Sequence, residues 1–518
     1  MAGVMVLSAP AYGQVRLPAL GESASDDLSV GAERRLGEQI MREGRRDPQY
    51  LDDPVLLEYL QQLWNPLVAA ARARGDINAE TDQVFAWEAF LVRDRSVNAF
   101  ALPGGYVGVH LGLMALTTAG DQLASVLAHE LTHITQRHIA RSIAPQQRAS
   151  MMAIAAFLLG IIAASRSSNI DAANAAIMGG QAAAIQGQLN FSRDMEREAD
   201  RIGYGVLSAA GYSPAGMAAM FEKLDVATRL NDNSGFPYLR SHPLTVDRIA
   251  EARNRALLGG GTAPVPTLQH AVMQMRARVM MDDSAQSLQR FSGGTSSPLL
   301  TDRVAALYGG ALAASLLRDP ARAESQAADA LRQAASATPR EPLAERAVVL
   351  LQAQLRMARS DAAGALQALD GLRTGATERP PMLLRAQAAL DLNRSAPGSH
   401  ATALRESTEA LQSWVAEHPQ DPAAWEQLAA TSDALGLKLR SMRAAAEARS
   451  VVGDLTGAID RLRAAQQVSR GAIGQDFIEG SVIDARLRQI TAQRRQLQLD
   501  AREARGGRGS GPDEPLPQ

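Results

Sequence analysis

The sequence predicts a large, mainly α-helical protein of two or three domains. Three observations lead to this fold class. The chain has 518 residues, enough for two or three domains. Hydrophobic residues make up 46% of it but aromatic residues only 4%, a balance that suits packed helices better than a β-sandwich. A breaker-rich stretch, residues 259–267, separates two parts of the chain.

The first segment, residues 1–25, precedes the predicted folded region. Met1 to Ala11 is apolar and small, and Ala11-Tyr12-Gly13 would suit a signal-peptidase site, although no positively charged region comes before it. Two interpretations are open: a signal peptide whose start lies upstream, or an amino-terminal arm of the mature protein. We favour the signal peptide, because the folded pattern starts only near Leu28.

A strand is predicted from Val107 to Leu113, entered through a Pro-Gly-Gly bend. An edge strand here could pair with an extended substrate backbone by β-augmentation. The alternative is a plain core hairpin, and it stays open. The substrate-binding candidates are Asn98, Ala99, Phe100, Gly104 and Gly105.

The most informative segment is residues 129–133, HELTH, which is an HExxH pattern. Residues four apart on a helix lie about 40° apart around the axis and about 6 Å along it, so His129 and His133 can reach one metal ion. Glu130 lies beside such a metal, where its carboxylate can take a proton from a bound water. The pattern therefore predicts a zinc hydrolase.

The flanks of this pattern predict one buried helix from Asp121 to Ala140. Its apolar face consists of Leu123, Val126, Leu127, Leu131 and Ile134. A chance HExxH on a surface helix would not usually be this apolar on both sides. On one continuous helix His138 lies about 180° from His129, which would exclude it from the metal site.

Residues 151–164 form an apolar run, followed by small residues at 172–187. As a helix the run spans about 21 Å, too short for a hydrocarbon core about 30 Å thick. We favour a helical hairpin in the core of the catalytic domain. A mobile lid, or a surface for a membrane or a partner, stays open.

A third metal ligand is predicted at Glu196, well downstream of the HExxH pattern. Asp200 shares its helix face and could orient a ligand histidine. Glu198 lies about 200° around the helix from Glu196, so we expect a solvated charge there.

From residue 268 to 502 the chain is a succession of alanine- and leucine-rich helices with short Pro or Gly interruptions. The clearest unit runs from Asp421 and Trp425 through Gly453 to Leu462, with a spacing of about 34 residues. We expect roughly three to five tetratricopeptide-like repeats, with a non-repetitive bundle as the alternative. Residues 503–518 are Gly-rich and predict a disordered tail.

Composition excludes several function classes. A formal net charge of −2 and a pI near 6.5 give no reason to expect nucleic acid as a partner. The chain has no cysteine, so a disulfide framework, a thiolate nucleophile and a Cys-based zinc site are excluded.

Taken together, HELTH, residues 196–200 (EREAD), residues 98–105 (NAFALPGG) and residues 241–243 (SHP) resemble the M48 family of zinc metallopeptidases. More narrowly, the chain resembles the periplasmic branch of that family in which tetratricopeptide repeats follow the protease. The resemblance implies an α+β zincin-type (gluzincin) metalloprotease domain over residues 26–258.

The resemblance also implies one Zn²⁺ per chain on His129, His133 and Glu196, with Glu130 as catalytic base. It implies a role for His242 and for Arg248 at the active-site cleft. His242 could donate to the oxyanion, or be a fourth zinc ligand that holds the enzyme latent, or merely precede a proline at a helix entry.

The expected function is thus a periplasmic zinc endopeptidase acting on polypeptides. The resemblance implies outer-membrane proteins in difficulty during assembly as clients, with the repeats binding clients or assembly partners. Peripheral membrane association is compatible with the sequence, but no transmembrane span is expected. The alternative is a chaperone or adaptor, in which the repeats are the active part and the metal site is structural or latent.

Overall fold

The computed structural model describes residues 28–142, 192–230, 236–259, 262–291, 293, 297–372, 378–398, 400–470 and 475–506. The expected signal peptide or arm at 1–25 and the expected hairpin or lid at 151–187 lie outside the described residues.

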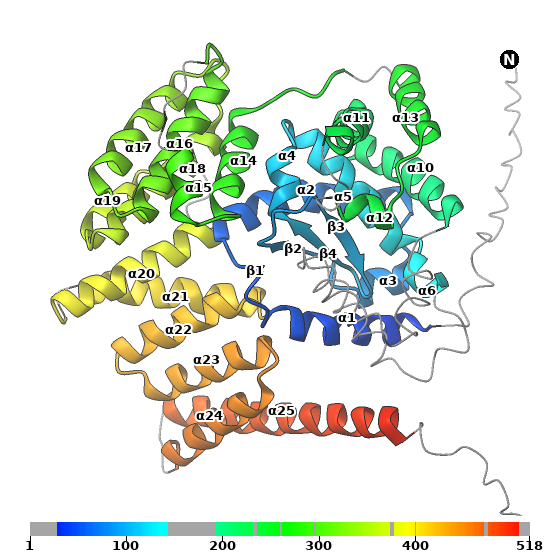
Figure 1. Cartoon of the computed structure of the whole chain (residues 1–518). Coiled ribbons are helices and arrows are strands. Elements are labelled where there is room, and N and C mark those ends of the chain that lie inside the picture. Colours follow the sequence, from blue (N-terminus) through cyan, green and yellow to red (C-terminus); the bar gives the residue numbers. More distant parts are fainter. Residues whose placement is uncertain are drawn as a thin grey trace, which may run out of the picture.

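The amino-terminal domain wraps helices around one small sheet (Figure 1). Its elements are α1 (Val30–Gly44), β1 (Tyr50–Leu51), α2 (Pro54–Arg74), α3 (Ala79–Val84), β2 (Glu88–Val92), β3 (Ala99–Leu102), β4 (Tyr106–His110), α4 (Leu111–Leu116), α5 (Gly120–Thr135), α6 (His138–Ser142), α10 (Arg193–Ala209), α11 (Ala215–Leu230), α12 (Tyr238–Ser241) and α13 (Val246–Leu258).

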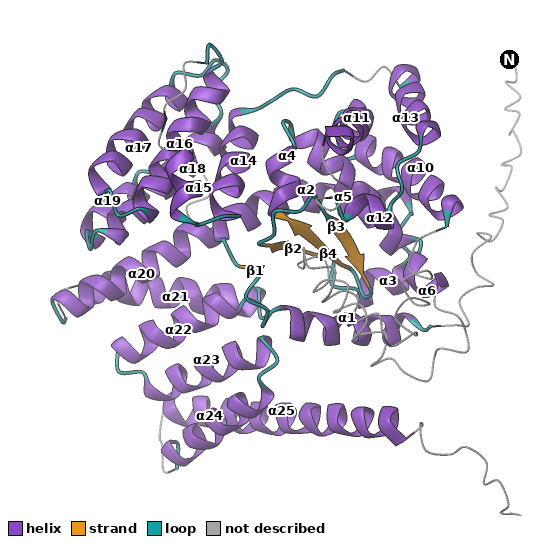
Figure 2. Cartoon of the chain, in the orientation of Figure 1, coloured by secondary structure: helices purple, strands orange, loops and turns teal. Residues whose placement is uncertain are grey.

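The sheet has the order β1-β2-β4-β3, with β2 and β4 parallel and the other pairs antiparallel (Figure 2). Strands β3 and β4 form a hairpin whose bend contains Gly104 and Gly105, at φ +77° and +91°. Glycine is needed at Gly104 for a second reason, since a Cβ there would lie 2.9 Å from the Cα of Arg34. Helix α5 packs against β3 and β4, which places the HExxH pattern beside an edge of the sheet.

The strand expected from Val107 to Leu113 is shorter than predicted. It ends at His110, and Leu111 and Leu113 belong to α4. Leu111 to Ala115 is buried throughout, so the segment has no polar face from which its period could be read. Strand β4 is also interior to the sheet, and β3 is the edge strand on its side.

The single helix expected from Asp121 to Ala140 is also a wrong prediction. Helix α5 ends at Thr135, and Arg137 adopts a left-handed conformation at φ +51° before α6 begins. That conformation costs roughly 1–2 kcal/mol for a residue with a Cβ. It is held by a distant contact, because Nε of Arg137 donates to Oε2 of the buried Glu33 at 2.9 Å.

The remaining helices continue as a curved array that starts beside α4 and ends below α1 in Figure 1. They are α14 (Leu268–Met280), α15 (Ala285–Arg290), α16 (Leu300–Leu316), α17 (Pro320–Ala335), α18 (Pro342–Ala358), α19 (Ala362–Asp370), α20 (Arg379–Ser395), α21 (Ala401–Glu417), α22 (Pro422–Ala434), α23 (Lys438–Val451), α24 (Leu455–Val468) and α25 (Gln475–Gly506).

From α16 onward consecutive helices of this array pack together, as a tetratricopeptide-like solenoid requires, and α14 packs against α16. Helix α25 extends to Gly506, past the boundary expected at 502, because residues 501–504 (AREA) are good helix formers. The rest of the predicted tail, residues 507–518, lies outside the described residues. Within the part of the chain that is described, no helix combines the length and apolar character needed to cross a bilayer.

The first helix of the array is joined firmly to the amino-terminal domain. Nδ1 of His270, on α14, lies 2.6 Å from the hydroxyl of Tyr59, on α2. Arg276, also on α14, donates from Nε and Nη2 to the two carboxylate oxygens of Asp53 at 2.8 and 2.6 Å. Both members of that ion pair are buried, so the amino-terminal domain and the first helices of the array share one core.

Candidate metal centre

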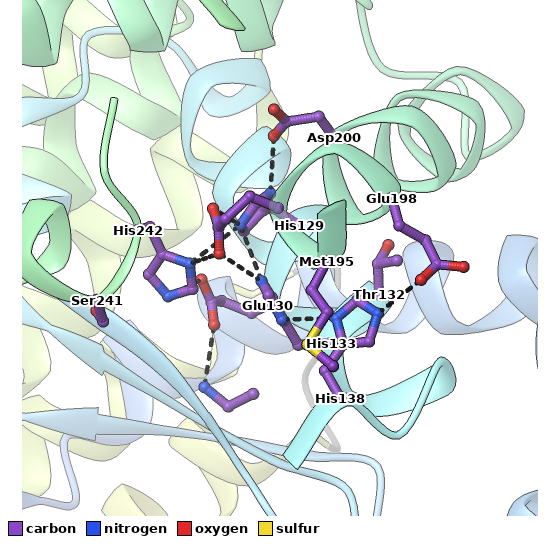
Figure 3. Close-up of polar contacts among 12 residues, drawn as sticks. His129, Glu130, Thr132, His133, His138, Met195, Glu198, Asp200, Ser241 and His242 are labelled. Atoms are coloured by element: carbon purple, nitrogen blue, oxygen red, sulfur yellow. Dashed lines mark hydrogen bonds and ion pairs between the residues drawn. The ribbon is translucent and has the colours of Figure 1, made fainter. Parts of the chain in front are cut away.

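Four side chains that can bind a metal meet in the interior of the amino-terminal domain (Figure 3). Helix α5 supplies His129 and His133, α10 supplies Glu196, and His242 follows α12. Nε2 of His129 lies 3.1 Å from Nε2 of His133 and 3.2 Å from Nδ1 of His242. Oxygens of Glu196 lie 3.5 Å from Nε2 of each α5 histidine and 2.9 Å from Nδ1 of His242.

These spacings fit a tetrahedral zinc ion. Ligand distances of about 2.0–2.2 Å at tetrahedral angles separate neighbouring ligand atoms by roughly 3.3–3.5 Å. The four donors lie within 4.8 Å of one another, and all four side chains are buried. Three imidazole nitrogens and a carboxylate form a donor set that zinc accepts. The residues present therefore fit one Zn²⁺.

Helix α10 is set against α5 so that its acidic face meets the histidines. Ser192 caps its amino terminus by accepting from the backbone N–H of Met195 at 3.2 Å. Gly203 permits the close approach, since a Cβ there would lie 3.1 Å from the carbonyl oxygen of Ala128. Glu196 and Asp200 share the buried face, as predicted.

Asp200 is the partner of His129. Its Oδ1 lies 3.0 Å from Nδ1 of that histidine, on the side of the ring opposite the metal-facing nitrogen. Burial opposes a charge on His129, but the carboxylates of Asp200 and Glu196 outweigh it and raise its pKa to about 10 in the metal-free site. The contact is the one expected for a residue that orients a metal ligand.

Arg248 completes this buried group. Its Nε and Nη2 donate to the carboxylate of Asp200 at 2.7 and 2.8 Å, and its Nη1 lies 2.9 Å from Oε2 of Glu196. Nη1 also donates to the carbonyl oxygen of Pro243 at 2.8 Å. Burial works against both acidic charges, but His242 and His129 hold the pKa of Glu196 below its ordinary value, and Arg248 and His129 do the same for the pKa of Asp200.

Glu130 faces the same centre and is fully buried. Its Oε2 accepts from the backbone N–H of Ala101 on β3 at 3.0 Å, and its Oε1 lies 3.6 Å from Nε2 of His242. Burial raises the pKa of Glu130 above its ordinary value. The HExxH glutamate therefore lies beside the four donors, and β3 is the element that holds it.

His138 is not among the four donors, as expected, but its position and the contacts of Glu198 differ from what one continuous helix predicts. The left-handed turn at Arg137 brings Nδ1 of His138 to 2.9 Å from Nδ1 of His133, although a continuous helix would keep it away. Glu198 is not a solvated charge, because its Oε2 lies 3.0 Å from Nε2 of His138 and 3.1 Å from Nη1 of Arg141. Burial lowers the pKa of His138 to about 4, so this imidazole is neutral near pH 7.

The expected substrate-binding residues separate into two groups. Ala99 and Phe100 lie in β3, next to Asn98, whose carbonyl oxygen accepts from the N–H of His110 on β4 at 3.0 Å. Gly104 and Gly105 lie beyond the far end of β3 and pack against α1 and the segment before β2. The two glycines thus shape the hairpin and do not join the donor cluster.

Two contacts of the site had no signal in the sequence. Ala101 acts through its backbone N–H, which any residue but proline would offer at that position. Tyr238 stacks on His242 with ring centroids 4.7 Å apart, and its buried hydroxyl has no hydrogen-bond partner among the described residues. Tyrosine four residues before a histidine carries no pattern by itself.

Comparison with known proteins places this geometry in a family. Residues 58–256 match the model of peptidase family M48. The chain is 30% identical to the beta-barrel assembly-enhancing protease of Escherichia coli K12 over 500 residues, which cover 93% of this chain and 92% of that protein. A Vibrio cholerae protein provisionally given the same name is 37% identical over 303 residues, covering 58% of this chain and 60% of its own length. The mitochondrial metalloendopeptidase OMA1 of Schizosaccharomyces pombe is 29% identical over 241 residues, covering 43% of this chain and 61% of that protein.

Proposed function

This chain is a metallopeptidase of family M48, whose members use zinc, and from that premise we propose that it is an endopeptidase of stalled or misfolded client proteins. The observation that carries the proposal is the convergence of four buried donors beside a buried glutamate. A purely structural zinc site would have no use for Glu130, which is fully buried beside the four donors and is held by the backbone N–H of Ala101 on β3.

The roles we assign follow from the contacts. Zinc held by His129, His133 and Glu196 would polarise the scissile carbonyl and acidify a water molecule. Glu130 takes the proton of the attacking water and later delivers it to the leaving amine. The N–H of Ala101 keeps the Glu130 carboxylate aimed at the centre while this happens.

We assign the substrate backbone to the outer edge of β3. Because Asn98 directs its carbonyl oxygen to β4, the alternation of an antiparallel ladder directs the backbone groups of Ala99 and Ala101 away from β4. An extended peptide added along this edge would run past Glu130 and the four donors. Unfolded or locally extended polypeptides are therefore the substrates proposed.

We further propose that His242 is a fourth zinc ligand in the resting protein. Support comes from its Nδ1, which lies 3.2 Å from Nε2 of His129 and 2.9 Å from Glu196 Oε1. A ligand there occupies the position that water needs, which would keep the enzyme latent. Arg248 has its donors on Asp200, Glu196 and Pro243, so we assign it the positioning of ligands and not the oxyanion.

Location and clients rest on the relatives. The name of the Escherichia coli relative ties it to β-barrel assembly, and it matches this chain along nearly its whole length. We therefore propose that this chain acts in the periplasm on outer-membrane proteins during assembly, with the helical array binding clients or the assembly machinery. Peripheral contact with a membrane is compatible with this role.

The decisive comparison is wild type against Glu130→Gln, measured as zinc content and cleavage of casein. We expect both proteins to bind one zinc, and cleavage by the variant to fall by about 10²–10⁴-fold. Full cleavage by Glu130→Gln would refute the enzymatic proposal and favour the chaperone or adaptor.

Latency has its own test in His242→Ala. If His242 closes the site, the variant keeps zinc on three ligands and its basal cleavage rises above that of wild type. A loss of cleavage with zinc retained would instead assign His242 to the oxyanion.

A further inference from the structure

The two histidines of the HExxH pattern are held by different partners. Nδ1 of His129 meets a carboxylate directly, at 3.0 Å from Asp200 Oδ1. Nδ1 of His133 meets another imidazole, at 2.9 Å from Nδ1 of His138. The rings of His133 and His138 are 4.9 Å apart at 76°, so the contact is edge to face and not stacked (Figure 3).

The positions of the ring protons on His133 and His138 follow from which nitrogen of His133 faces the other donors. Nε2 of His133 faces the other donors, at 3.1 Å from His129 Nε2, so a metal there requires the proton of His133 to sit on Nδ1. His133 then donates, and Nδ1 of His138 must accept. The remaining proton of His138 is on Nε2, which donates to Glu198 Oε2 at 3.0 Å. One tautomer of each ring satisfies these two hydrogen bonds.

The outer end of the path is anchored. Nη1 of Arg141 lies 3.1 Å from the same Glu198 oxygen, and the hydroxyl of Ser142 donates to the carbonyl oxygen of His138 at 2.7 Å. His138 is fully buried, whereas the Glu198 side chain is 28% exposed and lines a surface pocket of about 500 Å³. The path therefore runs from the metal centre to the surface.

We propose that His138 and Glu198 are positioning residues that hold His133 in its metal-binding tautomer and orientation. This inference rests on the proposed function, because it assumes that Nε2 of His133 binds zinc. Loss of such an outer partner typically weakens metal binding by about 10–100-fold. Arg137 contributes to the same arrangement, because the left-handed turn at this residue places His138 next to His133.

The test measures zinc affinity of the full chain by competition with a chromophoric chelator. His138→Leu removes the acceptor and should weaken zinc binding by about 10–100-fold. His138→Asn places a carboxamide oxygen near the position of Nδ1, so it should recover most of that loss. Thermal unfolding of the metal-free proteins shows whether both variants fold.

A matched pair on α10 tests the outer end. Glu198→Ala removes the acceptor for His138 and should weaken zinc binding measurably, even if His138→Leu fails to fold. Arg197→Ala, next to it in the chain, removes a 59% exposed side chain whose ion pair within the described part of the chain is with the exposed Asp194, and it should change nothing.

Two results would overturn the inference: zinc affinity of folded His138→Leu equal to wild type, or His138→Asn as weak as His138→Leu. If His138→Leu does not fold, equal affinities of Glu198→Ala and Arg197→Ala overturn it. Failure of the proposed function looks different. In that case wild type itself binds no zinc, or neither wild type nor His242→Ala cleaves casein, whereas failure of this inference alone leaves zinc binding and that cleavage intact.

Discussion

Two buried arginine–aspartate ion pairs in this molecule have the same bidentate geometry but different structural roles. Arg248 and Asp200 lie behind the metal centre, and Arg276 and Asp53 lie where α14 meets the amino-terminal domain. In each pair Nε and Nη2 bind the two carboxylate oxygens, at 2.7 and 2.8 Å in the first and 2.8 and 2.6 Å in the second.

The difference lies in the remaining contacts. Asp200 also contacts His129, and Arg248 also contacts Glu196, so the first pair interacts directly with two of the proposed metal ligands. Asp53 accepts from the N–H of Leu56 as the cap of α2, and Arg276 donates to the hydroxyl of Tyr308 on α16. The second pair therefore fastens the helical array to the catalytic domain. The geometry of a buried ion pair therefore does not show its role, whereas the additional contacts of its two residues do.

The largest effect is expected from breaking the junction pair. Arg276→Ala leaves Asp53 charged and buried, which should lower the free energy of unfolding by about 3–5 kcal/mol in chemical denaturation. Zinc affinity should not change. The control is Arg463→Ala, which breaks an exposed pair with Asp460 and should cost at most about 1 kcal/mol. Equal costs for the two variants would contradict the assigned duty of Arg276.

Breaking the pair at the metal centre should act on zinc. Asp200→Asn keeps the shape of the side chain but removes the charge opposite His129, so zinc affinity should fall by about 10–100-fold in chelator competition. Asp53→Asn is the matched change at the junction and should leave zinc affinity as in wild type. If both variants bind zinc alike, the two pairs do not differ as described.

A second junction contact should make stability depend on pH. Glu58 lies between the cation Arg346 and the carboxylate of Glu378. Burial raises the pKa of Glu58 to about 7. Because the folded pKa lies above the unfolded one, its contribution is fully present below about pH 4.5 and is lost as pH rises through 7.

Stability should therefore fall by about 1–2 kcal/mol between pH 5 and pH 8 on account of Glu58, allowing for its partial exposure. Glu58→Gln should flatten this part of the profile in melting experiments, whereas the exposed Glu43→Gln should not. An unchanged profile in Glu58→Gln would show that the group does not titrate in this range.

The smallest effect separates two buried tyrosines. The Tyr308 hydroxyl accepts from Nη1 of Arg276 at 2.9 Å, whereas the Tyr238 hydroxyl has no partner among the described residues. Tyr308→Phe should lower the free energy of unfolding by about 1 kcal/mol. Tyr238→Phe should cost nothing in the same measurement. A cost for Tyr238→Phe equal to that of Tyr308→Phe would mean that the hydroxyl is bonded in solution.

Much of the site could be predicted from short-range helical geometry. The four-residue spacings of His129 with His133 and of Glu196 with Asp200 place each pair on one face, and the structure joins the two faces. The mainly helical fold was predictable for the same reason, since composition and period act locally, whereas the α+β first domain was implied by the family resemblance.

What could not be predicted depends on contacts between distant residues. No glycine or proline marks the turn at Arg137, which is stabilised by Glu33, some hundred residues away in the chain. That one turn brings His138 next to His133 and gives Glu198 a buried partner, although His138 stays outside the donor set as expected. Likewise, the sequence predicts strand at Leu111 and Leu113, which belong to α4, because a fully buried run has no polar face from which a helical period can be read. The hydrogen bond from the backbone N–H of Ala101 to Glu130 could not be predicted either, because a backbone group leaves no signal in residue type.

The central claim is that His129, His133, His242 and Glu196 surround one zinc. X-ray absorption at the zinc edge of the full chain tests it most directly. The expected result is three imidazole nitrogens and one oxygen at about 2.0–2.2 Å, with one imidazole lost in His242→Ala. Zinc with two imidazoles in wild type, and an unchanged spectrum in His242→Ala, would contradict the four-ligand centre.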